Sequence, residues 1–205
     1  MAESTNSRLE AFCDGVFAIA LTLLIIDIKI PAGANIKTND DLWLAIKNLS
    51  PTIVAFLLSF TTILITWVSH HNTLKLVNKS SPQFIYSNGL LLLTIVFIPF
   101  PTSLLGQYIL TDHATPAVAL YSYVNVLMAI SWNLLSRAAL RPKHPLTVNE
   151  KSTLAMRKIN RNSYYSIGIN TAFTVLAFWF PLLVALFICV IWITWLIIGM
   201  KIKGE

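Results

Sequence analysis

Long apolar runs alternate with short polar segments along this chain. A helix needs about 20 mainly apolar residues to cross the hydrocarbon core of a bilayer, and several runs approach or reach that length. The segments between them contain proline, asparagine and charged residues, which are typical of turns. The pattern predicts an all-α integral membrane protein with one domain over residues 1–205 and six spans, at about 8–29, 42–69, 83–104, 116–137, 162–178 and 180–200.

Prolines and basic residues set the predicted limits of the later spans. Pro99 and Pro101 predict a helix break that ends the third span, and Pro181 predicts a tight hairpin between the fifth and sixth. The basic segment between the fourth and fifth spans, residues 137–162, is predicted to be the longest loop. Within it, residues 148–160 could form a short amphipathic helix that lies on anionic headgroups.

The positive charges indicate how the spans are oriented. With both termini in the cytoplasm, every one of the 15 lysines and arginines except Lys29, Lys37 and Lys47 lies on the cytoplasmic side. This asymmetry follows the positive-inside rule and requires an even number of crossings, which six satisfies. Because topology accounts for the net charge of +6, we do not expect nucleic-acid binding.

Composition agrees with a membrane protein. The chain is 56% hydrophobic and 12% charged, whereas soluble domains contain about 25% charged residues. A cleaved signal peptide is an alternative interpretation of the first apolar run, but Asp14 lies inside what would be its apolar region. We therefore expect the first run to be a membrane helix.

That first run, RLEAFCDGVFAIALTLLIID from residue 8 to residue 27, carries ionisable groups that lipid alone would not tolerate. At about 100° per residue, a helix places its residues on two different sides. The polar edge holds Cys13 and Asp14, which need a hydrogen-bonding partner at that depth. The other side is a mainly apolar row centred on Ile19. Its further members, all within about 40° of Ile19, are Arg8, Phe12, Gly15, Leu23 and Ile26. Thr22 lies about 60° from Ile19.

The end of the second span offers partners for the polar edge. It reads WVSHHN, and the topology places it at the same depth as the carboxylate of Asp14. A histidine or the indole N–H of tryptophan can donate to that carboxylate. We do not expect a metal site, because adjacent helix residues point about 100° apart. The candidate members of the structural network that holds the first helix are Arg8, Phe12, Cys13, Asp14, Trp67, His70, His71 and Asn72.

The same first run resembles a known signature. The string R-x-x-x-F-C-D-G-V-F-A-I-A-L-T-L-L is similar to the first-helix motif R-x-x-x-F-S-D of the transmembrane protein 175 family, endosomal and lysosomal potassium channels with prokaryotic relatives. The match is dense over about twenty residues, with Cys13 standing where the family usually has serine. A thiol is the weaker hydrogen-bonding group, so the network around it is expected to be looser.

The resemblance implies a function and an assembly. A potassium-permeable cation channel is implied, with the first helix lining the pore, its narrowest point at Ile19 and further rings at Leu23 and Ile26. Thr22 offers a hydroxyl that could replace a hydration water. The family's animal members carry two six-helix units and dimerise, which implies a homotetramer here. Without the resemblance, ordinary core packing would be the better interpretation of the apolar row.

Acidic residues near the outer end allow two interpretations. Asp27, Asp40 and Asp41 could form a cation-attracting outer mouth. Alternatively, Asp40 and Asp41 lie at the start of the next helix and favour its dipole. We favour the second interpretation for these two residues and leave both open for Asp27.

Several classes of site are not indicated by any motif. The sequence contains no phosphate-binding or dinucleotide-binding glycine motif, no H-E-x-x-H, no G-x-S-x-G and no T-V-G-Y-G filter. We expect no enzyme activity and no cofactor, with potassium and other monovalent cations as permeant ions. The alternative function is a proton- or cation-coupled secondary transporter that titrates Asp14, Asp27 and His70; a membrane enzyme ranks third. The expected location is a prokaryotic plasma membrane.

Overall fold

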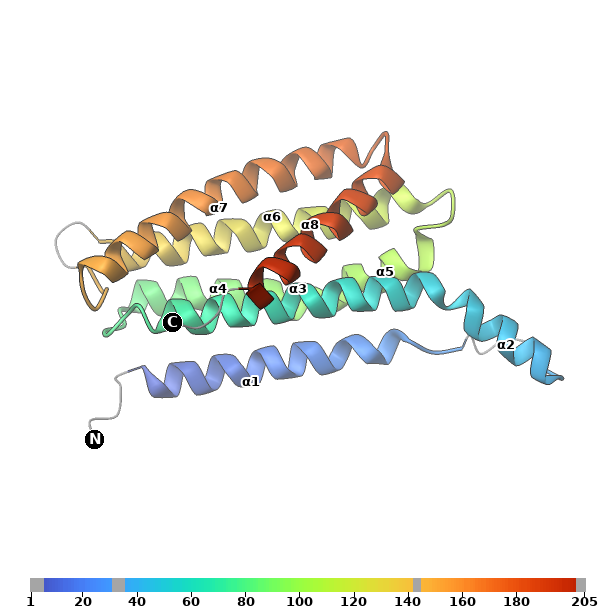
Figure 1. Cartoon of the computed structure of the whole chain (residues 1–205), viewed down its shortest axis with the longest axis horizontal. Helices are drawn as coiled ribbons and strands as arrows, with labels where there is room; N and C mark the ends of the chain where they lie inside the picture. The colour runs from blue at the N-terminus through green and yellow to red at the C-terminus, as the bar shows by residue number, and fades with distance from the viewer. Residues whose placement is uncertain (1–5, 31–35, 142–144, 202–205) are drawn as a thin grey trace.

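The computed structural model describes residues 6–30, 36–141 and 145–201, and this part of the chain is helical apart from turns and one isolated antiparallel bridge between Val77 and Thr147. Successive long elements run in alternate directions along one bundle (Figure 1). The elements are α1 (Ser7–Leu23), the 3₁₀ helix η1 (Leu24–Asp27), α2 (Asn39–Asn48), α3 (Ser50–Leu74), α4 (Pro82–Phe97), α5 (Pro99–Tyr108), α6 (Ala114–Ala139), α7 (Glu150–Leu176) and α8 (Pro181–Lys201).

Four stretches of the described chain are long and apolar enough to cross a membrane. They are Ser7–Asp27, Ser50–Leu74, Pro82–Tyr108 and Ala114–Ala139. Helix α7 is long but begins with many polar residues, and the apolar helix Pro181–Thr194 is shorter than the other four. The all-α membrane architecture is therefore confirmed, and the count of six spans stays a prediction.

Helix α6 forms the centre of the bundle. It packs on α4, α5, α7 and α8, and small residues such as Ala138 and Ala139 let its neighbours approach closely. Some of its polar side chains bond to neighbouring helices, as is common for polar groups inside a membrane bundle. The Tyr121 hydroxyl accepts from Ser59 of α3 at 3.2 Å, and Asn133 Nδ2 donates to Ser163 Oγ of α7 at 3.0 Å.

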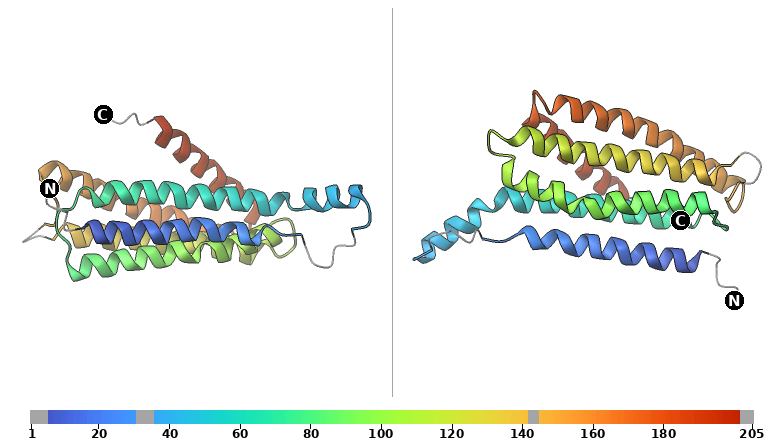
Figure 2. Two further views of the ribbon diagram at one scale, coloured as in Figure 1. Left: turned by 90° about the horizontal axis from the view of Figure 1, so that it is seen from below. Right: turned by 180° about the vertical axis from the view of Figure 1, so that it is seen from behind.

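Helix α1 lies at the edge of the bundle, where it packs on α3 and α4 (Figures 1 and 2). The predicted first span, residues 8–29, ends two residues later than the apolar stretch Ser7–Asp27, whose last turn tightens from α-helix into η1. In a 3₁₀ helix the side chains at i and i+3 eclipse. Leu23 and Ile26 are consequently aligned more closely than in a continuous α-helix.

The second and third predicted spans also differ from the structure. The second is divided into α2 and α3, with Pro51 in the first turn of α3, and it continues to Leu74. The third does not end at its prolines: Pro99 begins α5, which continues to Tyr108. Proline is tolerated in a first turn, where its missing N–H would have no partner, so these prolines interrupt the helix without stopping it.

Two predictions for the C-terminal part were wrong. Residues 150–160 are the first turns of α7 and pack with α6, so the separate surface helix predicted at 148–160 does not form. Their polar composition resembled a loop, but Asn149 caps the helix by accepting from the Ser152 amide at 2.8 Å. Helix α8 does not pair closely with α7 as a hairpin; it crosses α3 and α6 obliquely (Figures 1 and 2).

Candidate functional site

One face of α1 is anchored to the rest of the bundle. Cys13, Phe17, Ala20 and Leu24 are each at most 1% exposed, and their spacing of three or four residues places them on one side of the helix. They pack among the buried side chains of α3, α4 and α6. The orientation of α1 about its own axis is thus fixed by apolar packing.

The opposite face of α1 is largely exposed in the described chain. A Cβ added at Gly15 would have nothing within 4 Å, and Arg8 is exposed at the start of the same face. The large apolar side chains there are Phe12 (62% exposed), Ile19 (57%), Leu23 (37%) and Ile26 (61%). Exposure alone does not distinguish a pore from a lipid contact, because Leu93 of α4 is 63% exposed.

Two carboxylates on the edge of α1 bind one face of α3. The indole Nε1 of Trp67 donates to Asp14 Oδ1 at 2.8 Å, which is the tryptophan partner that the sequence predicted. One turn away, His71 Nδ1 lies 2.9 Å from Glu10 Oε1, although without the alignment of a hydrogen bond. The rings of Trp67 and His71 stack with their centroids 6.1 Å apart. Four side chains therefore connect the two helices over one turn.

A second, fully buried chain of contacts involves His70. Its Nε2 lies 2.6 Å from Asn88 Oδ1, and Asn88 Nδ2 donates to Cys13 Sγ at 3.0 Å. Because the Asn88 oxygen is an acceptor, Nε2 of His70 must carry the proton. The imidazole ring lies between Phe17, at 5.4 Å, and Trp132, at 6.3 Å. This chain links α1, α3 and α4 through the thiol of Cys13.

The structure therefore separates residues that the sequence grouped together. Neither His70 nor His71 contacts Asp14, because each points to a different carboxylate or amide. Within the described part of the chain, no hydrogen bond or ion pair joins Arg8 or Asn72 to the network, so their membership stays a prediction. The exposed side chain of Phe12 also lies outside it.

Sequence reasoning missed two members of the network. Glu10 lies four residues before Asp14, a spacing that places both carboxylates on one side of α1 and could have indicated its role. Asn88 is a single amide inside the apolar run of α4, where an unpaired polar group would be costly. The N-terminal Asn6 is also buried, and its Nδ2 donates to the Val77 carbonyl at 3.1 Å.

The remaining candidates have different surroundings. Thr22 donates its hydroxyl to the Ile19 carbonyl at 2.9 Å, which leaves its oxygen free to accept from water or face a cation. Asp41 caps α2 by accepting from the Thr38 amide at 2.8 Å and the Lys37 amide at 3.0 Å, as the dipole interpretation expected. Asp27 is half-buried at the end of η1.

Comparison with known proteins connects this geometry to one family. Residues 8–99 match the sequence model described as endosomal/lysosomal potassium channel TMEM175. A potassium channel of Chamaesiphon minutus is 42% identical over 137 residues, which cover 67% of each chain. The crystal structure of a lysosomal potassium-selective channel TMEM175 homolog from that organism superposes with a TM-score of 0.83 at 33% identity, covering 95% of this chain and 98% of that one. The chain belongs to the TMEM175 family.

Other TMEM175 relatives share less of the chain. A potassium channel of Streptomyces collinus is 40% identical over 63% of this chain and 62% of its own length. The human protein, named endosomal/lysosomal proton channel TMEM175, is 35% identical over 38% of this chain and 16% of its own length. The family is thus one of ion channels rather than enzymes, and membrane location and cation transport follow from membership.

Proposed function

We propose that this TMEM175 family member is a potassium-permeable cation channel whose pore is lined by α1 from four identical copies. The observation that carries the proposal is the two-sided character of α1. Its buried face is held on α3 and α4 by apolar packing and four polar side chains, while the opposite face presents bulky apolar side chains that are largely exposed. One helix cannot enclose a pore, so a pore lined by this face requires further copies around an axis.

Stacked apolar rings would form the filter and gate. Ile19 and Leu23 are separated by one α-helical turn, about 6 Å along the axis. Ile26 lies about 6 Å further on, because η1 rises about 2.0 Å per residue, and it eclipses Leu23. Apolar constrictions gate by excluding water, and a larger, more weakly hydrated cation loses less when its hydration shell is disturbed. Potassium is then favoured over sodium, modestly, with the Thr22 oxygen as a replacement ligand.

The proposed setting follows from the same arrangement. The chain crosses a prokaryotic plasma membrane six times with both termini in the cytoplasm, and the network at Asp14 and Trp67 lies near the cytoplasmic end of α1. Asp27, beyond the apolar rings, attracts cations at the outer mouth. Because the network residues face away from the exposed apolar row, their role is to hold the orientation of α1 and not to contact the ion.

Ion flux from purified protein in liposomes tests the proposal. We expect potassium flux to exceed sodium flux in the wild type, and Ile19→Asn to reduce this preference because a polar ring no longer excludes water. Ile193→Asn is a matched control, since Ile193 of α8 is also 57% exposed but lies on a different helix. Native mass spectrometry of the same sample should give the mass of four chains.

Three outcomes would contradict the proposal. Equal flux and equal preference in wild type and Ile19→Asn would move the constriction away from Ile19. An equal change in Ile193→Asn would show that any polar substitution in the membrane has the same effect. Saturable flux far below channel rates would indicate the alternative, a secondary transporter that uses Asp14, Asp27 and His70.

A further inference from the structure

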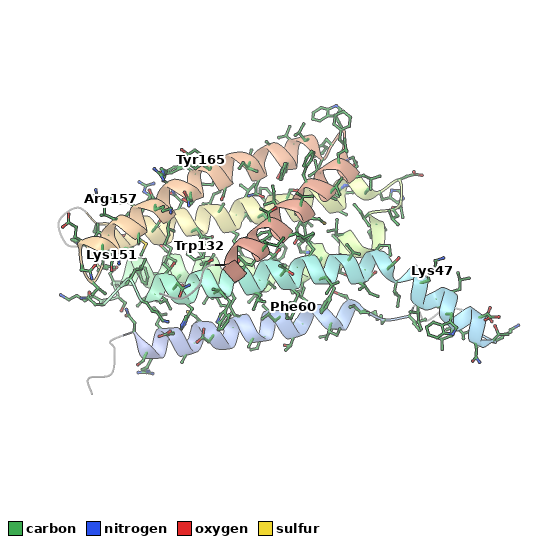
Figure 3. All side chains as sticks on the ribbon, in the orientation of Figure 1. Lys47, Phe60, Trp132, Lys151, Arg157 and Tyr165 are labelled. Atoms are coloured by element: carbon green, nitrogen blue, oxygen red, sulfur yellow. The ribbon has the colours of Figure 1, made fainter. Side chains whose placement is uncertain are left out.

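A groove with a volume of about 760 Å³ opens between α3, α6, α7 and α8, away from the exposed face of α1. Trp132 of α6 lies between α3 and α7 in this region (Figure 3). Sites that hold organic ligands typically measure about 300–1,000 Å³. The groove is therefore large enough for a bound molecule, and the oblique path of α8 leaves it open.

The walls of the groove are mainly apolar, with hydroxyl and amide side chains interspersed along its length. Ile65 of α3, Phe173 of α7 and Ile188 of α8 line the apolar part. Asn72, near the end of α3, and Asn162 of α7 also line it. Asn72 lies near the end of the bundle where α7 begins, and Asn162 lies half-way along α7. A mainly apolar slot that extends toward this end of the bundle can hold the acyl chain of an amphiphile.

Positive charge on α7 lies beside the groove, toward the end of the bundle where α7 begins. Lys151 and Lys158 are exposed on α7 and lie within about 70° of the direction in which its groove residues point. Lys158 is one turn before Asn162. By contrast, Arg157 and Arg161 lie on the opposite side of the same helix, about 130° or more from the groove direction. Figure 3 places Lys151 and Arg157 at the same end of the bundle.

We propose that the groove binds an anionic phospholipid from the bilayer, with an acyl chain in the apolar slot and the phosphate against Lys158 and Lys151. Charge favours this occupant over a second copy of the chain. At this end of the described bundle, the carboxylates of Glu10 and Asp14 already contact α3, and Glu150 lies on the side of α7 away from the groove. A second copy therefore has few free anions to offer two lysines, whereas an anionic leaflet supplies many.

Fluorescence quenching by brominated lipids tests the proposal on the full chain in liposomes. Trp132 and Trp192 both line the groove, so brominated phosphatidylglycerol should quench a component of the emission that Trp132→Phe removes. Brominated phosphatidylcholine should quench that component less at equal mole fraction. Ser166→Phe, which places a ring in the groove, should abolish the preference, and Thr171→Phe, on the opposite side of α7, should leave it unchanged.

Two double variants that lose the same charge distinguish lipid binding at the groove from a general attraction of anionic lipids to the positively charged surface of the protein. The Lys151→Gln/Lys158→Gln variant should lower the preference for phosphatidylglycerol by about fivefold per lysine. The Arg157→Gln/Arg161→Gln variant should leave it within about twofold of wild type, because these side chains face away from the groove. Both variants change exposed residues, so they keep the test usable if Ser166→Phe does not fold.

Any of three results would overturn the proposal. An equal loss of preference in the two double variants would mean that only surface charge is sensed. The absence of a Trp132-dependent component would mean that lipid does not enter the groove. Cross-linking between cysteines placed at Ser166 and at any site of another copy would show that a second chain covers it. None of these measurements depends on ion flux, so they are independent of the proposed function.

Discussion

Cys13 is the residue at which this chain departs from the first-helix motif R-x-x-x-F-S-D, which it otherwise matches. It accepts a hydrogen bond from Asn88, whose oxygen is occupied by His70, so a single side chain of α1 completes a buried polar chain across three helices. Sulfur is a weak acceptor, yet its removal would leave a buried N–H without a partner. Position 13 therefore requires a side chain that accepts a hydrogen bond, and either a sulfur or an oxygen atom can do so.

Substitution of Cys13 tests this requirement. The free energy of unfolding of Cys13→Ser should lie within about 1 kcal/mol of the wild-type value, because a hydroxyl still accepts from Asn88 Nδ2. Cys13→Ala should be less stable by about 1–3 kcal/mol, since the amide loses its partner. Thermal or denaturant unfolding in detergent, followed by circular dichroism, measures the difference. Equal stability of the serine and alanine variants would show that the contact contributes nothing beyond packing.

Part of this network could be predicted from the sequence, and part could not. The Trp67–Asp14 contact followed from the depth of the two residues and from the need to pair a carboxylate. The division of His70 and His71 between Asn88 and Glu10 did not follow, because it depends on the crossing geometry of α1, α3 and α4. Sequence spacing shows on which side of its own helix a residue lies. The partner that its side chain meets depends on how the helices cross.

At the scale of elements, the approach of α5 to α3 depends on one glycine. A Cβ added at Gly106 would lie 2.8 Å from the Cα of Thr52, and the Thr52 hydroxyl donates to the Gly106 carbonyl at 3.4 Å. Small residues permit such close contact between membrane helices. This contact holds the two helices together beyond the interruption at Pro99 and Pro101.

Gly106→Ala should therefore destabilise the protein by about 1–3 kcal/mol, because the methyl group must push the two backbones apart. Gly168→Ala on α7 is the matched control: nothing lies within 4 Å of its added Cβ, and alanine should stabilise the helix by up to about 1 kcal/mol. Unfolding midpoints of the two variants in the same detergent give the comparison. Similar effects in both would mean that α5 and α3 adjust freely.

The capping of α2 predicts a pH dependence at its N-terminus. The amide of Lys37, followed by the hydroxyl and amide of Thr38, holds the pKa of Asp41 below its usual range. A carboxylate with a lowered pKa stabilises the folded form above its unfolded pKa of about 3.9, and this contribution is lost as the pH falls through the lowered value. The cap should therefore open on acidification.

Hydrogen exchange of the amides at residues 37–41 measures this opening. Protection should decrease as the pH falls below about 4 in the wild type, after correction for intrinsic exchange rates. Asp41→Asn should show weaker protection without that change. A wild-type cap that stays protected through the same range would contradict the assignment to Asp41.

Element boundaries were the least predictable part of the fold. Apolar runs located α1, α3, α4 and α6, because these helices contact lipid or core along most of their length. The first turns of α7 were missed, since they combine charged residues with contacts to α6 that no local pattern reveals. The tightening of Leu24–Asp27 into η1 was also invisible, because its residues are as apolar as those of the helix before it.

At the scale of the molecule, the two ends of the bundle differ in charge. Lys47 lies at one end, and Lys151 and Arg157 lie at the other (Figure 3). This separation has the asymmetry that the positive-inside rule describes, and the direction of insertion stays a prediction. The number of copies around the pore was implied by resemblance alone, because no residue pattern in one chain encodes rotational symmetry.

The edge position of α1 has a consequence for biosynthesis. Trp67 is 53 residues later than Asp14, and Asn88 is 75 residues later than Cys13. At about 5–20 residues per second, a ribosome needs roughly 3–10 s to make the first of these partners. During that interval the newly inserted first helix carries a carboxylate with no tryptophan to pair it. The buried polar groups of α1 are thus paired only after α3 and α4 have followed it into the membrane.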